Sequence, residues 1–150
     1  MFCWLFARRV SRVLFHKVYP FCRLFLLERK SVSEIKKALI TFHYTERIKA
    51  NLILAAKLLE SLSDVRDEEV SGAERLLVAY FRALIGEVNI AAGASGVGGF
   101  QNVNLKLEDA IEQVKKHNYS NAERLVSEAV VITTTNGVQA AQLLKEKDLI

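Results

Sequence analysis

The chain is poor in proline, cysteine, methionine and tryptophan, and these scarcities narrow what it can be. Its 150 residues contain one Pro, two Cys, one Met and one Trp, and all five lie within the first 30 positions. The thiols Cys3 and Cys22 make neither a disulfide framework nor a zinc site, because no second cysteine pair or paired histidines accompany them. A single proline and only 9% aromatic residues favour helices over a β-sandwich. A body without the oxidisable residues Cys, Met and Trp suits a hot or stressed source.

Positive charge is concentrated at the N-terminus. Residues 1–30 contain seven Lys/Arg and one acidic residue, whereas residues 31–150 contain 14 basic and 16 acidic side chains. The formal net charge of +4 therefore describes the first segment and not the body. We expect two parts, a basic aromatic-rich segment at 1–30 and a helical domain at 31–150. Nucleic-acid binding is not expected of the body.

The N-terminal segment, residues 1–30, has the pattern of a basic amphipathic helix, and three interpretations stay open. Charges recur too often for a membrane-spanning helix, and the apolar stretch precedes the arginines, unlike in a secretory signal. The segment could lie on an anionic membrane or dock on a partner. It could be an organelle-targeting peptide. Alternatively, it is translated upstream sequence, and the native chain begins at Val32.

Hydrophobic periodicity predicts four helices in the body, at about 32–63, 72–92, 105–117 and 121–147. Apolar residues recur at spacings of three and four within each range. The predicted stripes are Ile35, Leu39, Phe42, Ile48, Leu52, Ala55, Leu59 and Leu62; Ala73, Leu77, Tyr80, Leu84, Val88 and Ala91; Leu107, Ala110, Ile111 and Val114; and Ala122, Val126, Ala129, Thr133, Asn136, Ala140 and Leu143. Amphipathic helices joined by short polar turns bury such stripes together, so we expect an all-α, antiparallel four-helix bundle.

Two nearly identical heptapeptides, "SGAERLL" from residue 71 and "SNAERLV" from residue 120, occur before apolar runs. Each contains Ser-x-x-Glu, the capping box in which a serine and a glutamate satisfy the first free N–H groups of a helix. The predicted boxes are Ser31–Glu34, Ser71–Glu74 and Ser120–Glu123. The repeat also suggests duplication, with two related helical hairpins, although common capping chemistry explains it nearly as well.

Two stretches leave local structure open. "GASGVGGFQNVN" predicts a glycine-rich connection, with Gly93 ending the second helix and Asn104 capping the third. "VVITTTNGV", residues 130–138, is compatible with a strand and a hairpin turn. Helical periodicity on both sides favours a helix that is kinked or briefly broken near Gly137.

The glycine loop is the first candidate site. The amides of Gly93, Gly96, Gly98 and Gly99 could bind an anion or small ligand ahead of the third helix. The loop lacks the GK[ST] ending of a P-loop, and no strand precedes it. A flexible interhelical connection is the simpler interpretation.

Polar residues within the helices are the remaining candidates. His43, Glu46 and Arg47 are helical neighbours, but a di-iron bundle needs paired ExxH motifs and further glutamates, so a surface charge cluster is expected and no metal. Glu87 lies close to the apolar stripe of the second helix, and Asn89 lies inside the same helix. Asn136 falls on the stripe of the fourth helix, where a buried amide can set register or oligomeric state.

These patterns favour a non-catalytic interaction or oligomerisation module. We expect no cofactor and no enzymatic activity, and self-association, as a dimer, through the first and fourth helices. One alternative is a peripheral membrane or nucleic-acid adaptor that uses residues 1–30 as a basic arm. Another is a small-ligand binder or enzyme with its site in the core or glycine loop. A cytoplasmic location is expected, with membrane attachment only if residues 1–30 are native.

Overall fold

The computed structural model describes residues 12–150, with side chains for residues 32–62 and 64–150. Its elements are α1 (Arg12–Ser61), the short 3-10 helix η1 (Leu62–Asp64), α2 (Asp67–Ser95), α3 (Gly99–Lys115) and α4 (Tyr119–Glu146). No strand occurs between residues 12 and 150. The predicted all-α fold is confirmed.

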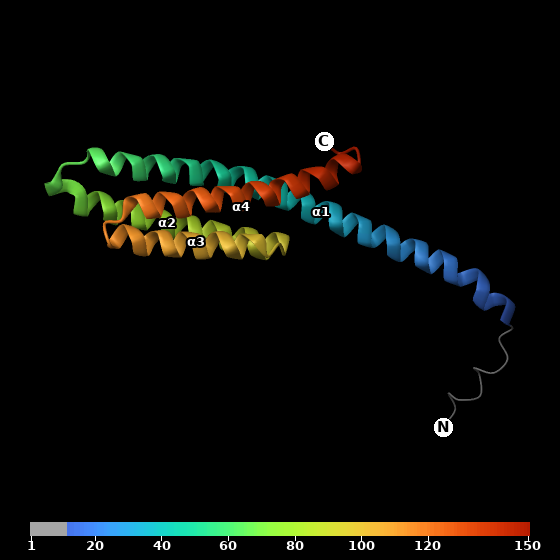
Figure 1. The fold of residues 1–150 in the computed structure, drawn as a ribbon. Coiled ribbons are helices and arrows are strands. Elements are labelled where there is room, and N and C mark those ends of the chain that lie inside the picture. The colour runs from blue at the N-terminus through green and yellow to red at the C-terminus, as the bar shows by residue number, and fades with distance from the viewer. Residues whose placement is uncertain (1–11) are drawn as a thin grey trace, which may run out of the picture. The chain divides into compact units, whose positions relative to one another are not determined.

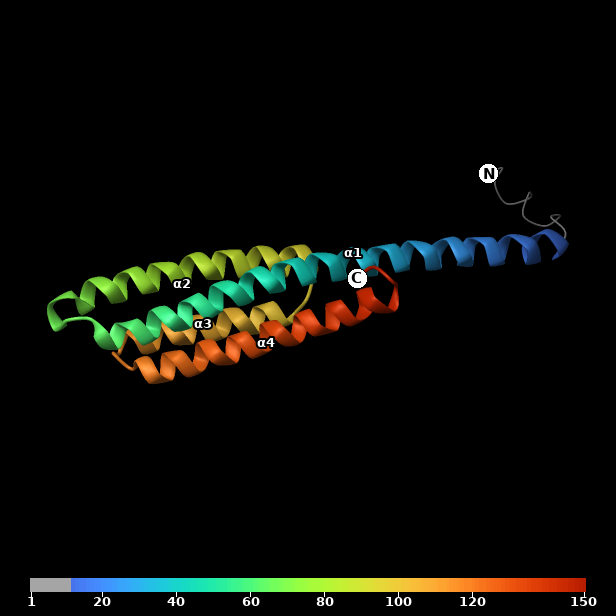
Figure 2. The same ribbon diagram turned by 90° about the horizontal axis from the view of Figure 1, so that it is seen from above.

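Residues 36–150 form one compact unit, an antiparallel four-helix bundle. Successive helices run in opposite directions, as the colour order from teal to red shows in both views (Figures 1 and 2). Polar contacts or close packing join each neighbouring pair: α1 with α2, α2 with α3, α3 with α4, and α4 with α1. Each helix therefore packs against two others around a shared core.

The core consists mostly of the residues of the predicted stripes, with a few differences. From position 48 to the end of η1 the buried apolar residues are those expected: Ile48, Leu52, Ala55 and Leu59 of α1 and Leu62 of η1. Phe81, Phe100 and Val103 join the core although the stripes omitted them. Leu39, expected to be buried, is 47% exposed, and Leu144 is buried in place of Leu143.

The three capping boxes are not helix starts, which corrects the predicted boundaries. Helix α1 begins at Arg12, so Ser31 lies inside it. Helix α2 begins at Asp67 because Asp67, Glu68 and Glu69 supply negative charge to its first turn. Ser71 is consequently interior. Helix α4 begins at Tyr119, where the side chain of Asn118 accepts from the Asn121 amide at 3.3 Å.

The two heptapeptides have the same pattern of buried residues, and neither one begins a helix. Their third residues, Ala73 and Ala122, pack on or in the core, and their seventh residues, Leu77 and Val126, are buried. The repeated letters therefore place equivalent residues against the core of two helices that run in the same direction (Figure 1).

The glycine-rich connection is much shorter than expected. Helix α2 continues through Gly93 and ends at Ser95. The next residue, Gly96, caps the helix with a left-handed backbone (φ 69°) and a bond from its N–H to Ala92 O at 2.9 Å. Helix α3 starts at Gly99, so Asn104 is interior and caps nothing.

Residues 130–138 are helical throughout, as the sequence favoured over a strand, but the brief break predicted near Gly137 does not occur. The hydroxyls of Thr133, Thr134 and Thr135 each donate to the carbonyl oxygen four residues earlier at 2.8–2.9 Å. These bonds satisfy the threonines within the helix, where β-branched residues are otherwise disfavoured.

The basic face predicted for residues 1–30 lies outside the residues whose side chains are described. The backbone of residues 12–30 belongs to α1. The three interpretations of that segment stay predictions.

Candidate functional site

Glu87 is the centre of a polar cluster that joins α1 to α2. Its Oε2 accepts a hydrogen bond from Asn51 Nδ2 at 3.1 Å, and its Oε1 forms an ion pair with Arg47 Nε. Tyr80 Oη donates to the main-chain oxygen of Asn51 at 3.0 Å. The Glu87 side chain is 17% exposed and that of Arg47 62%. The structure thus brings together two candidates, Arg47 and Glu87, that the sequence had placed in separate groups.

The cluster serves as a tie between helices. Burial raises the pKa of the Tyr80 hydroxyl, and the negative charge of Glu87 raises it further. Tyr80 is therefore a neutral donor at physiological pH, and its proton is committed to a main-chain carbonyl. Because each group is engaged by the opposite helix, this geometry positions helices and presents no free nucleophile–base pair.

The two residues that the sequence grouped with Arg47, His43 and Glu46, do not join the cluster around Glu87. Glu46 pairs with Lys49 on the surface at 2.7 Å, as the predicted charge cluster implies. The exposed His43 ring meets the adjacent Tyr44 edge-on, with ring centroids 5.8 Å apart. The structure does not join His43 to Arg47.

Asn89 contributes a second tie, between α2 and α3. Its Oδ1 accepts from Asn104 Nδ2 at 2.5 Å, and Asn104 Oδ1 is buried without a hydrogen-bond partner among the described residues. Asn104, expected as a cap, thus packs against α2 instead.

The four candidate glycines occupy four different structural settings. Gly93 is helical in α2, Gly96 is the left-handed cap, Gly98 precedes α3, and Gly99 is its first residue. Gly99 lies directly against Asn136, because a Cβ at this position would overlap the Asn136 amide. Whether these glycines bind an anion stays a prediction.

Asn136 belongs to a group of buried polar residues at the end of the bundle where α3 begins. The group comprises Thr41, Thr45, Ser95, Thr133 and Asn136. Thr41, Ser95 and Thr133 bond back to their own helices. Thr45 Oγ1 and Asn136 Nδ2 have no hydrogen-bond partner among the described residues, and neither atom is accessible to water. Their close packing specifies how α1, α3 and α4 meet.

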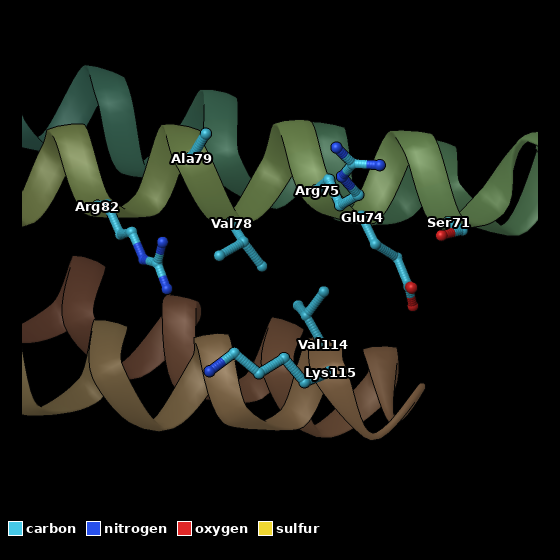
Figure 3. A pocket seen from close by; sticks show the side chains of 8 residues that line it. All are labelled: Ser71, Glu74, Arg75, Val78, Ala79, Arg82, Val114 and Lys115. Atoms are coloured by element: carbon cyan, nitrogen blue, oxygen red, sulfur yellow. The ribbon is translucent and has the colours of Figure 1, made fainter.

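A shallow groove of about 460 Å³ runs between α2 and α3. Figure 3 shows Val78 and Val114 facing each other across it, with Arg82 reaching from α2 toward α3. A second groove of about 600 Å³ shares Arg82 and Lys115 with the first and adds acidic residues of α3. Arg75 and Arg82 have no direct ion-pair partner among the described residues, although Glu108, Asp109 and Glu112 line the second groove together with Arg82.

Glu74 connects α2 to the turn between α3 and α4. Its Oε1 accepts from Tyr119 Oη at 2.6 Å and lies 2.7 Å from His117 Nδ1. Burial, with the hydrogen bond to Glu74 and its charge, raises the pKa of Tyr119 to about 12. The glutamate of the second predicted capping box therefore holds a distant turn.

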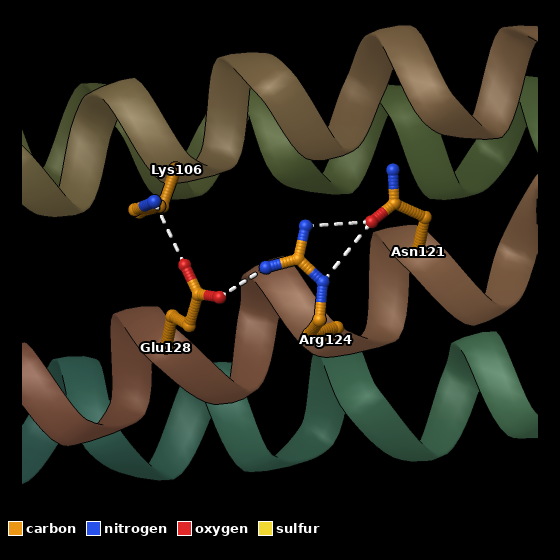
Figure 4. Close-up of polar contacts among 4 residues, drawn as sticks. All are labelled: Lys106, Asn121, Arg124 and Glu128. Carbon is orange, nitrogen blue, oxygen red and sulfur yellow. Dashed lines mark hydrogen bonds and ion pairs between the residues drawn. The ribbon is translucent and has the colours of Figure 1, made fainter.

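A further polar network joins α3 to α4 (Figure 4). Glu128 accepts from Lys106 Nζ at 2.7 Å and also pairs with Arg124, which donates to Asn121 Oδ1 at 2.7 and 3.1 Å. The bond from Lys106, together with the nearby positive charges, lowers the pKa of Glu128. All four side chains are exposed or partly exposed. The network therefore orients α3 and α4 relative to each other.

The most distinctive surface is the outer face of α2, which we define by seven exposed, uncharged positions. Their spacing alternates between four and three residues: Gly72, Leu76, Ala79, Ala83, Gly86, Ile90 and Gly93. Leu76 is 75% exposed and Ile90 62%. A Cβ built at Gly72, Gly86 or Gly93 would have no neighbour within 4 Å. The face runs for roughly 32 Å, and such a spacing is the pattern by which one helix packs on another.

The outer face was missed in the sequence because glycine and alanine contribute little to a hydrophobic pattern. The signal was the lack of charge at two positions of a seven-residue repeat, spaced by four and then three residues from 72 to 93. Helix α2 is also the one helix within residues 12–150 that is long and apolar enough to cross a membrane by length and composition. Its mean hydropathy of 1.4 over 18 residues comes from a buried stripe and the outer face together.

Among the described residues, no three His, Cys, Asp or Glu side chains gather closely enough to hold a metal ion. No protein-family model, no curated protein and no solved structure matches the chain.

Proposed function

We propose that the protein is a non-catalytic helical interaction module that binds a second copy of itself through the outer face of α2. The observation that carries the proposal is the exposed, uncharged heptad pattern from Gly72 to Gly93. A monomer that stayed alone would leave Leu76 and Ile90 in water along a continuous apolar strip, which soluble monomers rarely do.

The outer face of α2 fits this role better than the first and fourth helices, which the sequence had favoured. The exposed side of α1 carries His43, Glu46, Arg47 and Lys57 among its apolar residues. Helix α4 exposes Val131 and Val138 with two threonines between them, a run of only eight residues. The α2 face is nearly three times as long and uncharged along its whole length.

The small residues of the face support helix packing in particular. Glycine and alanine let the backbones of two helices approach closely, which increases van der Waals contact along the interface. The larger side chains of Leu76 and Ile90 then supply apolar contact area at two points along the helix. The polar ties of α2 to α1 and α3, through Glu87 and Asn89, hold this helix in place within the bundle.

Ala83→Glu tests the proposal, because Ala83 lies at the middle of the face and is exposed in the monomer. Sedimentation equilibrium is expected to show dimers of the wild type at tens of micromolar and monomers of Ala83→Glu. The matched control is Ala50→Glu, which makes the same change at an exposed position of α1. It should dimerise like the wild type. A wild-type protein that stays monomeric, or two glutamate variants with equal effects, would refute the proposal.

A further inference from the structure

Two arginines with no ion-pair partner border the outer face of α2 on the side of α3. Arg75 and Arg82 are exposed, and no ion pair or side-chain hydrogen bond engages either within the described residues. Every other charged residue of the central part of α2 is engaged, since Glu74 and Glu87 both have partners. These two cations are available to a molecule that docks on the face.

If the outer-face residues are the a and d positions of a seven-residue repeat, the position of each neighbouring residue in that repeat is fixed. Leu76, Ala83 and Ile90 occupy the a positions, and Gly72, Ala79, Gly86 and Gly93 occupy the d positions. The flanking g positions are then Arg75, Arg82 and Asn89, and the flanking e positions are Ala73, Tyr80, Glu87 and Ala94. Positive charge therefore lies only on the g side and negative charge only on the e side.

This segregation distinguishes the two ways in which a second copy can dock. Helices paired in parallel bring each g position beside the e position five residues later in the partner, whereas antiparallel helices bring g beside g and e beside e. In any antiparallel register, arginines therefore meet only arginines or neutral residues. In the parallel arrangement Arg82 meets Glu87 of the partner subunit, twice by symmetry, and Arg75 meets the neutral Tyr80 of the partner subunit.

We infer that two copies pair through α2 in parallel, about a two-fold axis along the helix, and that Arg82 sets this orientation by pairing with the partner's Glu87. The inference rests on the proposed function and adds the geometry and the residue that determines it. The Glu87 side chain is 17% exposed and its Oε1 is buried, so the carboxylate turns outward to meet the partner's Arg82. Its present ion partner, Arg47, is 62% exposed and so screened by water, which makes that pair weak.

Single cysteines on the outer face test the orientation. The variants are Leu76→Cys and Ile90→Cys, each made in the full chain with Cys3→Ser and Cys22→Ser. In a parallel pair each cysteine lies opposite its own copy, so each variant alone should form a disulfide-linked dimer on mild oxidation. The two positions are roughly 21 Å apart along the helix. A mixture that cross-links while neither variant does so alone shows antiparallel pairing. That result overturns the inference and leaves the proposed function standing.

Charge reversal tests the role of Arg82. Arg82→Glu replaces two attractive contacts across the interface with two repulsive ones and should raise the dimer dissociation constant about tenfold. Arg75→Glu makes the same change on the same side of the same helix, opposite a neutral residue, and should leave the constant within about threefold. Equal effects of the two reversals overturn the role of Arg82. Absence of any wild-type dimer removes the inference together with the proposed function.

Discussion

Gly137 of α4 lies directly against Thr45 of α1. A Cβ at position 137 would come within 2.5 Å of Thr45 Cγ2, closer than real Cβ contacts allow. Thr45 is 1% exposed and lies inside the bundle, so its methyl group has no room to retreat. The two helices therefore approach each other more closely here than any residue other than glycine permits.

Gly137→Ala should destabilise the bundle by about 1–3 kcal/mol, because overpacking outweighs the gain of about 1 kcal/mol that alanine brings to a helix. Urea unfolding followed by circular dichroism measures the change. Gly86→Ala is the control, since nothing lies within 4 Å of a Cβ there. At concentrations where the chain is monomeric, this control should gain about 0.5–1 kcal/mol. Equal stabilities of Gly137→Ala and the wild type would contradict the close contact.

Glu87 should matter more to stability than the arginine that pairs with it. Glu87→Ala leaves the Asn51 amide without its acceptor in a half-buried position and should cost about 1–3 kcal/mol. Arg47→Ala removes a side chain that is 62% exposed and should cost less than about 1 kcal/mol. Urea titrations of both variants give the comparison. The reverse order would show that the cluster does not tie α1 to α2 as described.

Tyr119 should make the bundle sensitive to alkaline pH. Its pKa is about 12 in the folded protein and about 10 in the unfolded chain, because burial and Glu74 favour the protonated form. The stabilisation is fully present below pH 10 and is lost as the pH rises from 10 toward 12. Unfolding free energies of the wild type and Tyr119→Phe, measured across this range, should converge as the pH rises. A difference that stays constant with pH would count against the contact with Glu74.

The sequence predicted the buried side of the helices because large apolar residues at three- and four-residue spacing leave few other arrangements. It misplaced the start of α2 because Asp67, Glu68 and Glu69 are equally suited to a polar turn and to a helix N-terminus. The burial of Asn136 followed from its place on the stripe. The contact of Asn136 with Gly99 did not, because it depends on how α3 meets α4.

The candidate surface could be predicted only in part. Gly72, Gly86 and Gly93 suggest loops when considered singly, since glycine weakens an isolated helix. Only after the core side of α2 is fixed by Phe81, Leu84 and Val88 does the opposite side become a continuous uncharged face. The sequence directed attention to Glu87, but its partner Arg47 lies 40 positions away and required the fold.

The accessibility of Ile90 in solution tests the central claim most directly. Ile90→Cys, in the full chain without its two native cysteines, should react with a maleimide more slowly as protein concentration rises from low to high micromolar. Ile53→Cys reports on an exposed position of α1, 45% accessible, and should react at the same rate throughout. Protection of position 90 alone is the predicted result. Labelling of position 90 that does not change with concentration would contradict burial of the outer face of α2 against a second copy.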